Sequence, residues 1–145
     1  MGYLRRAATL LVVAYGVMLC GIGVVGIFTA GWELTRVFGL DIAALDLHVR
    51  ATFLNQYRFL KAVELGGGLF CLFSRGSILA GGPIGKVFLA LVGGGVVARS
   101  LAWVIDGRPS WPFLAFLALE ALVFVVTVLY LWSRGLQGGS PRLDR

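Results

Sequence analysis

The strongest constraint on the fold is residues 7–30, a run of 24 residues that contains no charged side chain. A helix of about 20 apolar residues is long enough to cross the hydrocarbon core of a bilayer. The run therefore predicts a transmembrane helix with some room for tilt. We expect it to be retained, because a secretory signal peptide has a shorter apolar region and a small-residue cleavage site.

Three further apolar segments predict transmembrane helices at residues 53–73, 84–105 and 113–132. The sequence is 59% hydrophobic and only 14% charged, whereas about a quarter of the residues in soluble domains are charged. We therefore expect one all-α domain over residues 1–145, folded as an integral membrane four-helix transmembrane bundle. The tryptophans fall at the predicted span ends, where an aromatic belt would lie: Trp32, Trp103, Trp111 and Trp132.

Lysines and arginines divide unevenly between the two sides of this predicted bundle. One side carries Arg5, Arg6, Arg75, Lys86, Arg134, Arg142 and Arg145. The other side carries Arg36, Arg50 and Arg108. Because cytoplasmic loops are enriched in Lys and Arg, we expect both the N and the C terminus to be cytoplasmic.

Turn-forming residues predict the connections between the spans. Gly39 predicts a break, and Asp41 is the candidate cap of a helix that continues into the second span. His48 is expected in a loop. Residues 74–85 are expected to form a loop because they contain the turn signal Gly-Gly-Pro, and residues 106–110 a tight connection between antiparallel helices.

Besides Lys86 at the start of the third span, five charged side chains lie inside the predicted spans. The second span contains Arg58, Lys61 and Glu64, the third contains Arg99, and the fourth contains Glu120. A charge at the centre of a membrane helix costs about 2.5 to 3.5 kcal/mol on insertion scales, so the second span is expected to need partner helices. Ionisable residues inside a membrane are functional-site candidates for the same reason.

The expected depth of these charges brings several of them to one level. At about 1.5 Å per residue, Lys61 lies roughly 12 Å, Arg99 roughly 9 Å and Glu120 roughly 11 Å below the outer surface. The sequence therefore predicts a polar layer shared by three helices. Its members are Asn55, Arg58, Lys61, Glu64, Arg99, Asp106 and Glu120.

Two glycine triplets are expected near the middle of the membrane, where small residues let helix backbones approach closely. They are Gly66, Gly67, Gly68, Gly93, Gly94 and Gly95. We expect the triplets to pack on each other, with a kink as the alternative. Residues 21–26 form a literal Gly-x-Gly-x-x-Gly, but they lie inside an apolar span, so we interpret them as packing glycines and not as a dinucleotide site.

The polar layer has three interpretations. It forms an ion-pair network that holds the helices together, a pocket open to the outside, or a proton or ion path. The pocket would suit an anionic headgroup, a carboxylate or a quinone-like carbonyl, because the charges inside the spans are three bases and two acids. A path would also need polar groups in the inner half of the bundle, where few occur.

Metal, cofactor and nucleic acid binding find no support in the sequence. The two cysteines, Cys20 and Cys71, lie in apolar segments, and His48 is the single histidine, whereas a structural zinc site needs about four ligands. The net charge of +6 comes mostly from span ends, where Lys and Arg meet lipid headgroups. We expect no metal, no cofactor, no nucleic acid partner and no enzyme activity.

Several of these residues form a pattern that resembles a known family. The pattern consists of Asn55, Arg58, Ala98-Arg99-Ser100, Asp106-Gly107-Arg108-Pro109-Ser110 and Glu120. It is similar to a bacterial family of small membrane proteins catalogued as domain of unknown function 4345, with a looser similarity to the DoxX-like membrane proteins. The resemblance covers residues 52–122 and implies four transmembrane helices in a bacterial cytoplasmic (inner) membrane. It implies no activity, and Lys61 and Glu64 are not part of the pattern.

We expect the protein to be an accessory or structural subunit that docks on a larger membrane complex, with membrane lipids and protein subunits as its partners. The alternative is a small transporter, or a lipid-binding or anionic-ligand-binding protein, that uses an outward-facing charged pocket. An enzyme that acts on a lipid or a quinone is a third hypothesis, and it would need a substrate or cofactor near Glu120.

Overall fold

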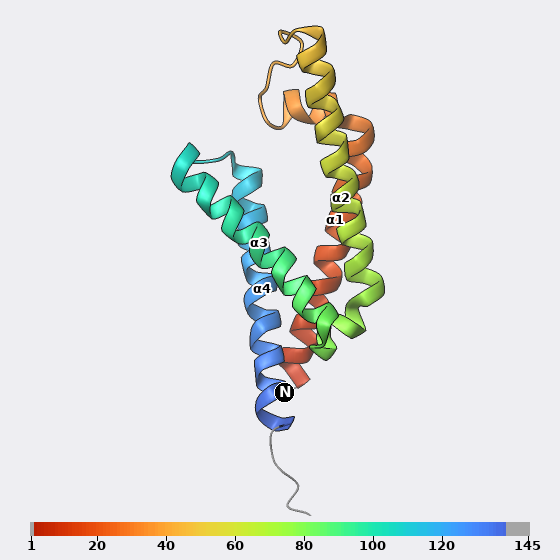
Figure 1. Cartoon of the computed structure of the whole chain (residues 1–145), viewed down its shortest axis with the longest axis vertical. Helices are drawn as coiled ribbons and strands as arrows, with labels where there is room; N and C mark the ends of the chain where they lie inside the picture. Colours follow the sequence, from red (N-terminus) through yellow and green to blue (C-terminus); the bar gives the residue numbers. More distant parts are fainter. Residues whose placement is uncertain (1, 139–145) are drawn as a thin grey trace, which may run out of the picture. The chain divides into compact units, whose positions relative to one another are not determined.

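The computed structural model describes residues 2–138 and consists of four α-helices (Figure 1). They are α1 (Gly2–Arg36), α2 (Leu47–Ala80), α3 (Pro83–Asp106) and α4 (Trp111–Gly138). All four are long and apolar enough to cross a membrane, which confirms the predicted all-α membrane fold. Cytoplasmic termini stay a prediction.

Part of the sequence lies outside the described residues. Arg142 and Arg145, which contribute to the charge count, belong to this part. Among the residues that the structure describes, the tryptophans are exposed, as side chains of an aromatic belt should be: Trp32, Trp103, Trp111 and Trp132.

The connection between α2 and α3 is shorter than predicted. The expected loop at residues 74–85 is wrong, because α2 continues to Ala80 and α3 begins at Pro83. Only Gly81 and Gly82 separate the helices, and Gly81 has a φ of +80°, a conformation that glycine adopts without steric cost. Proline at the first position of α3 fits there because that position needs no backbone N–H donor. The predicted span ends at residue 73 because hydropathy identifies only the part of a helix that crosses the hydrocarbon core, whereas α2 continues beyond that part.

The connection between α1 and α2 also differs from the prediction. Gly39 makes the expected break, with a φ of +71°. Asp41 does not cap α2: its Oδ1 accepts a 3.3 Å hydrogen bond from Ala44 N within a turn. Asp46 is the cap instead, because its Oδ1 accepts a 2.9 Å hydrogen bond from His48 N, in the manner of an N-cap. His48 therefore lies in the first turn of α2 and not in a loop.

The chain divides into two compact units. The α1–α2 unit is Ala14–Phe73, and the α3–α4 unit combines Met1–Val13 with Ser74–Arg145. The second unit thus includes the first turns of α1 and the last turns of α2. A single domain over residues 1–145 stays a prediction.

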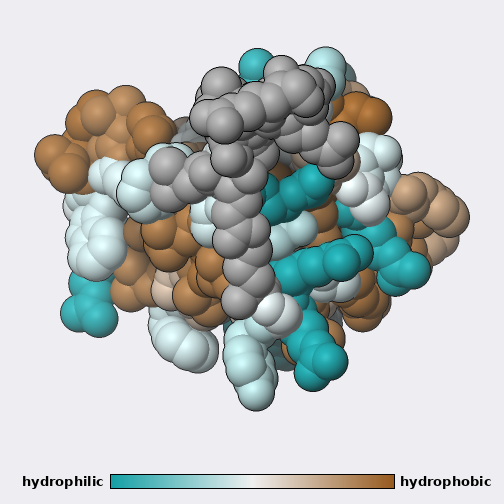
Figure 2. Space-filling model, turned by 90° about the horizontal axis from the view of Figure 1, so that it is seen from below, coloured by the Kyte–Doolittle hydropathy of each residue, from teal (hydrophilic) through white to brown (hydrophobic). Residues whose placement is uncertain are grey.

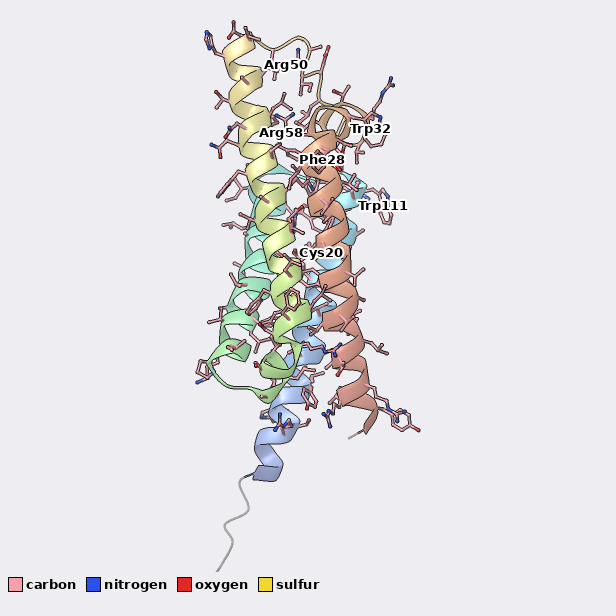
Figure 3. All side chains as sticks on the ribbon, turned by 90° about the vertical axis from the view of Figure 1, so that its right-hand side faces the viewer. Cys20, Phe28, Trp32, Arg50, Arg58 and Trp111 are labelled. Carbon is pink, nitrogen blue, oxygen red and sulfur yellow. The ribbon has the colours of Figure 1, made fainter. Side chains whose placement is uncertain are left out.

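Glycines bring the backbones of the α1–α2 unit into contact. A Cβ atom at Gly23 would lie 2.7 Å from Leu65 N, and one at Gly68 would lie 2.6 Å from Gly16 O. Backbone atoms this close leave no room for a side chain, so the two helices pack through glycine, as small residues allow in membranes. Figure 3 shows α1 and α2 side by side, with Cys20 between them. Gly23 belongs to the 21–26 motif, whose role as a packing element is thereby confirmed at this position.

In the α3–α4 unit, glycines of α3 face side chains of α4 and not its backbone. A Cβ atom at Gly93 would lie 2.8 Å from Phe124 Cε2, and one at Gly95 would lie 3.4 Å from Glu120 Oε2. The buried side chains around this contact are apolar except Thr127 and Glu120. Figure 1 shows α3 and α4 crossing and then diverging toward the connection at residues 107–110.

Each glycine triplet therefore has a packing partner within its own unit. Gly68 packs on α1, whereas Gly93 and Gly95 pack on α4. Two other members of the triplets, Gly66 and Gly94, face open space, since a Cβ added at either would meet no atom within 4 Å. Direct packing of one triplet on the other stays a prediction.

Replacing a packing glycine should destabilise the protein, and replacing an open one should not. We expect Gly23→Ala to lower the free energy of unfolding by about 1 to 3 kcal/mol, because its Cβ would overlap backbone atoms of α2. Gly21→Ala is the matched control, since its Cβ meets no atom within 4 Å. It should be neutral or slightly stabilising, because alanine favours helix over glycine. Reversible unfolding in mixed detergent micelles measures both, and equal stability of the two variants would contradict the glycine contact.

Candidate functional site

Three polar side chains, Glu33, Tyr57 and Glu64, surround Lys61 in the α1–α2 unit, and we call the four residues the Lys61 cluster. Lys61 Nζ lies 3.0 Å from Glu64 Oε2 and 3.8 Å from Glu33 Oε2. Tyr57 donates a 2.5 Å hydrogen bond from its hydroxyl to Glu33 Oε2, and its ring centroid lies 5.1 Å from Lys61 Nζ. Lys61 is only 7% exposed, so its charge is neutralised by neighbours and not by water.

The helix geometry explains how the Lys61 cluster forms. Tyr57, Lys61 and Glu64 lie on one face of α2 because they are separated by four and three residues. Gly26 of α1 provides the space for the lysine stem, since a Cβ there would lie 2.5 Å from Lys61 Cδ. Glu33 then approaches the ammonium group from the next turns of the same helix.

Glu33 and Tyr57 are the members of the cluster that the sequence analysis missed. Hydropathy ends the first span at residue 30, which leaves Glu33 in the polar connection. The helix in fact continues to Arg36, and Thr29 Oγ1, one turn earlier, contacts Glu33 Oε1 at 3.4 Å. A helical projection of residues 26–33 would have placed Glu33 on the same face as Gly26.

Arg58 has a different role from Lys61. It is exposed, and its Nε donates a 3.2 Å hydrogen bond to the carbonyl of Ile27 on α1 (Figure 3). Asn55 is also exposed on α2. The Lys61 cluster is therefore closed by its own members, which favours a structural role for it.

A second ion pair joins α3 and α4. Arg99 donates from Nε to Glu120 Oε2 at 2.9 Å and from Nη2 to Glu120 Oε1 at 3.5 Å. This arrangement matches the planar guanidinium to the carboxylate with two bonds. The guanidinium carbon also lies 5.9 Å and 5.5 Å from the ring centroids of Phe113 and Phe116. Gly95, one turn before Arg99, leaves room for the Glu120 carboxylate.

A cavity of about 370 Å³ lies beside this ion pair. We call it the α3–α4 cavity, and its lining is Arg99, Ala102, Trp103, Asp106, Gly107, Arg108, Pro109, Phe113 and Leu117. Glu120 is 5% exposed, whereas the Arg99 side chain keeps 30% of its surface exposed. Arg99 is thus the group that connects the buried pair to the open cavity.

The structure divides the predicted polar layer between the two units. Asn55, Arg58, Lys61 and Glu64 belong to the α1–α2 unit, whereas Arg99, Asp106 and Glu120 belong to the α3–α4 unit. A single layer shared by three helices stays a prediction. Within residues 2–138, no group of three or more His, Cys, Asp or Glu side chains is placed to hold a metal ion.

Comparison with known proteins gives one result. The family model described as "Domain of unknown function (DUF4345)" matches residues 7–132. No curated protein and no solved structure gives a match. The matched region includes both ion-pair clusters and the complete lining of the α3–α4 cavity.

Removing one member of the Arg99–Glu120 pair should lower the stability of the protein more than removing both. We expect Arg99→Met to lower the free energy of unfolding by about 3 to 5 kcal/mol, because it removes the positive charge that pairs with the buried Glu120 carboxylate. Adding Glu120→Met to that variant should restore part of the loss, since two apolar side chains can replace a buried ion pair. Unfolding of the two single variants and the double variant in mixed micelles gives the coupling energy.

Arg108→Met is the control for this cycle, because Arg108 is exposed and should change stability little. Additive losses in the double variant would show that the two side chains do not stabilise each other.

Proposed function

The chain belongs to the family described as "Domain of unknown function (DUF4345)", and from this premise we propose that it is a small multi-pass membrane protein that binds an amphipathic molecule in the α3–α4 cavity. The observation that carries the proposal is the position of Arg99. Its guanidinium group is held by Glu120 on one side and borders an open cavity on the other.

The size and the walls of the cavity suit a small apolar body. Ligand cavities in proteins commonly measure about 300 to 1,000 Å³ and combine apolar walls with a few polar groups, and this one measures about 370 Å³. Trp103, Phe113 and Leu117 supply large apolar surfaces, and Ala102 leaves space between them. Inside the cavity, the tail or ring of a lipid-like molecule would contact these side chains in place of the surrounding lipid.

Arg99 supplies the polar contact. A guanidinium group has five N–H donors and no acceptor, and the bonds to Glu120 use only Nε and Nη2. The exposed part of the side chain can therefore donate to an oxygen atom of a ligand. The rings of Phe113 and Phe116 also lie within cation–π distance of the guanidinium carbon and help to position it.

The charge balance of the site selects the kind of head group. Arg99 is neutralised by Glu120, and the two other charged residues in the lining, Asp106 and Arg108, have opposite signs. The site therefore has no surplus positive charge to offset an anion with several charges. Of the three ligand types considered from the sequence, an uncharged carbonyl, such as that of a quinone, therefore fits this balance better than an anionic head group or a carboxylate.

The position of the cavity lining supports ligand binding more directly than transport across the membrane. All of its residues fall between positions 99 and 117, at the end of α3 and α4 that adjoins their connection. If the termini are cytoplasmic, as we expect from the positive charges, this end faces outward. In that orientation, the protein would take its ligand from the outer half of a bacterial inner membrane.

Fluorescence of Trp103 provides the test. In a variant with Trp32, Trp111 and Trp132 replaced by phenylalanine, a benzoquinone with a decyl tail should quench Trp103 saturably in nanodiscs. Ala102→Phe fills the cavity and should weaken this binding by about tenfold or more, equivalent to about 1.4 kcal/mol. Leu101→Phe is the matched control, since Leu101 is exposed on the same helix and does not line the cavity.

Two results would contradict ligand binding. One is quenching that rises linearly with quinone concentration, as partition into lipid predicts. The other is equal quenching in the Ala102→Phe and Leu101→Phe variants.

Docking on a larger membrane complex is the second candidate. Ala90, Gly94 and Ala98 are exposed on α3 at intervals of four residues, a spacing at which small residues favour close packing of a second transmembrane helix. This observation favours a partner subunit that contributes one such helix.

The docking candidate predicts a specific sensitivity to side-chain size. Gly94→Leu should prevent co-purification of the partner from native membranes in mild detergent, without unfolding the chain, because a Cβ at Gly94 meets no atom within 4 Å. Leu91→Ala, on an exposed neighbouring position, should retain the partner. Purification of the unmodified protein as a stable monomer without other subunits would contradict this role.

A further inference from the structure

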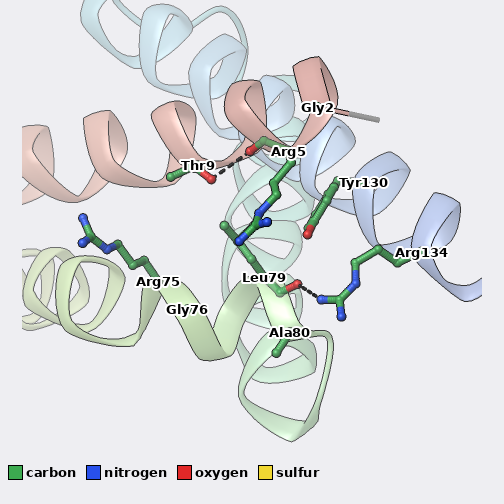
Figure 4. Close-up of a pocket in the computed structure, with 9 residues that line it drawn as sticks. All are labelled: Gly2, Arg5, Thr9, Arg75, Gly76, Leu79, Ala80, Tyr130 and Arg134. Carbon is green, nitrogen blue, oxygen red and sulfur yellow. Dashed lines mark hydrogen bonds between the residues drawn. The ribbon is translucent and has the colours of Figure 1, made fainter. Parts of the chain in front are cut away.

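A second cavity lies at the other end of the α3–α4 unit, where α1 begins and α2 and α4 end (Figure 4). We call it the basic cavity, and its volume is about 600 Å³. Its lining is Gly2, Arg5, Thr9, Arg75, Gly76, Leu79, Ala80, Tyr130 and Arg134. Neither the polar layer nor the α3–α4 cavity contains any of these residues.

The charges of the basic cavity all have one sign. Arg5, Arg75 and Arg134 come from three different helices, and no acidic residue lies in the lining. The described part of the unit contains two acidic residues, Asp106 and Glu120. Glu120 is paired with Arg99 and precedes Arg134 by 14 residues on α4, roughly 21 Å along the helix. Asp106 lies at the far end of α3.

Arg134 has a structural role in the basic cavity, whereas Arg5 and Arg75 can contact a ligand. Arg134 donates from Nη1 to the carbonyl of Leu79 at 2.7 Å, which satisfies an acceptor in the last turn of α2 that has no helical partner. This bond ties the end of α4 to the end of α2. Figure 4 shows Arg5 extending from α1 toward the space beside Leu79, with the hydroxyl of Tyr130 pointing into the same space.

Tyr130 adds a donor with little freedom to move. The residue is 7% exposed, so its ring is held by its neighbours while its hydroxyl lines the cavity. A tyrosine hydroxyl can donate to a phosphate oxygen, as guanidinium groups do. The cavity thus combines three positive charges with one fixed neutral donor.

The basic cavity lies at one end of the candidate membrane helices. The candidate membrane span of α1 begins at Gly2, and that of α4 ends at Gly135. Figure 2 views the molecule from this end and shows hydrophilic side chains gathered next to hydrophobic ones. Trp132, at the same end, is 65% exposed, as expected for a side chain at the membrane interface.

We propose that the basic cavity binds the phosphate groups of an anionic phospholipid. Basic pockets between transmembrane helices bind lipid head groups with several negative charges. Three arginines exceed what a single phosphodiester neutralises, so a head group with two phosphates binds more tightly than one with a single phosphate. A soluble phosphate ester shares this chemistry but lacks acyl chains beside the helices. This site is independent of the function proposed for the α3–α4 cavity.

Lipid titration of delipidated protein tests the site. In an uncharged detergent, native mass spectrometry should rank cardiolipin above phosphatidylglycerol and phosphatidylglycerol above phosphatidylcholine. Arg5→Gln and Arg75→Gln should each weaken cardiolipin binding about fivefold, from the usual contribution of one cation near a lipid surface. Arg6→Gln is the matched control, since Arg6 is exposed beside Arg5 and does not line the cavity, and it should change binding less than about twofold.

The outcomes separate a built site from diffuse attraction and from a soluble ligand. Equal losses in Arg5→Gln and Arg6→Gln would overturn the proposal, because they would show that only the net charge matters. Displacement of cardiolipin by equimolar pyrophosphate would overturn the lipid source. Arg5 and Arg75 are both exposed, so their variants should fold, and circular dichroism checks this.

A second variant tests the neutral donor. Tyr130→Phe retains the ring and all charges, so it should keep the protein folded and lower cardiolipin affinity while leaving phosphatidylcholine binding unchanged. An unchanged cardiolipin affinity would remove Tyr130 from the site.

Discussion

A charge inside hydrocarbon must be neutralised by nearby protein groups, and this requirement shapes both units of the protein. Insertion of one charge costs about 2.5 to 3.5 kcal/mol, which several apolar side chains are needed to offset. Lys61 meets the requirement through Glu33 and Glu64. Arg99 meets it through Glu120. The charges that make isolated helices poor membrane spans thus specify which helices pair and in which register.

Each pairing depends on a glycine that gives the buried charged side chain its space. Gly26 of α1 faces the stem of Lys61 on α2, and Gly95 of α3 faces the carboxylate of Glu120 on α4. A side chain at Gly26 would displace the stem of Lys61, whose Cδ lies 2.5 Å from the Cβ position, and one at Gly95 would contact the Glu120 carboxylate at 3.4 Å. In both units the packing glycine and the ion pair therefore lie at the same contact between two helices.

The two cavities also differ in the balance of charges in their linings, and therefore in the ligands that suit them. The α3–α4 cavity contains paired or opposed charges, which suits an uncharged polar head with an apolar body. The basic cavity has three arginines and no acidic residue in its lining, which suits phosphate. Both cavities use arginine, but only one contains an arginine that an internal carboxylate neutralises.

The sequence by itself determined the four membrane helices, because a bilayer imposes a minimum apolar length that hydropathy reads directly. It also singled out Lys61, Glu64, Arg99 and Glu120, since charges within such spans are rare and costly. Hydropathy does not indicate where a helix ends once it has left the bilayer. The sequence analysis therefore missed Glu33 and assigned the last turns of α2 to a loop. Only the tertiary structure decided which charges pair and where arginines from three helices converge, because these depend on the faces that packed helices turn toward each other.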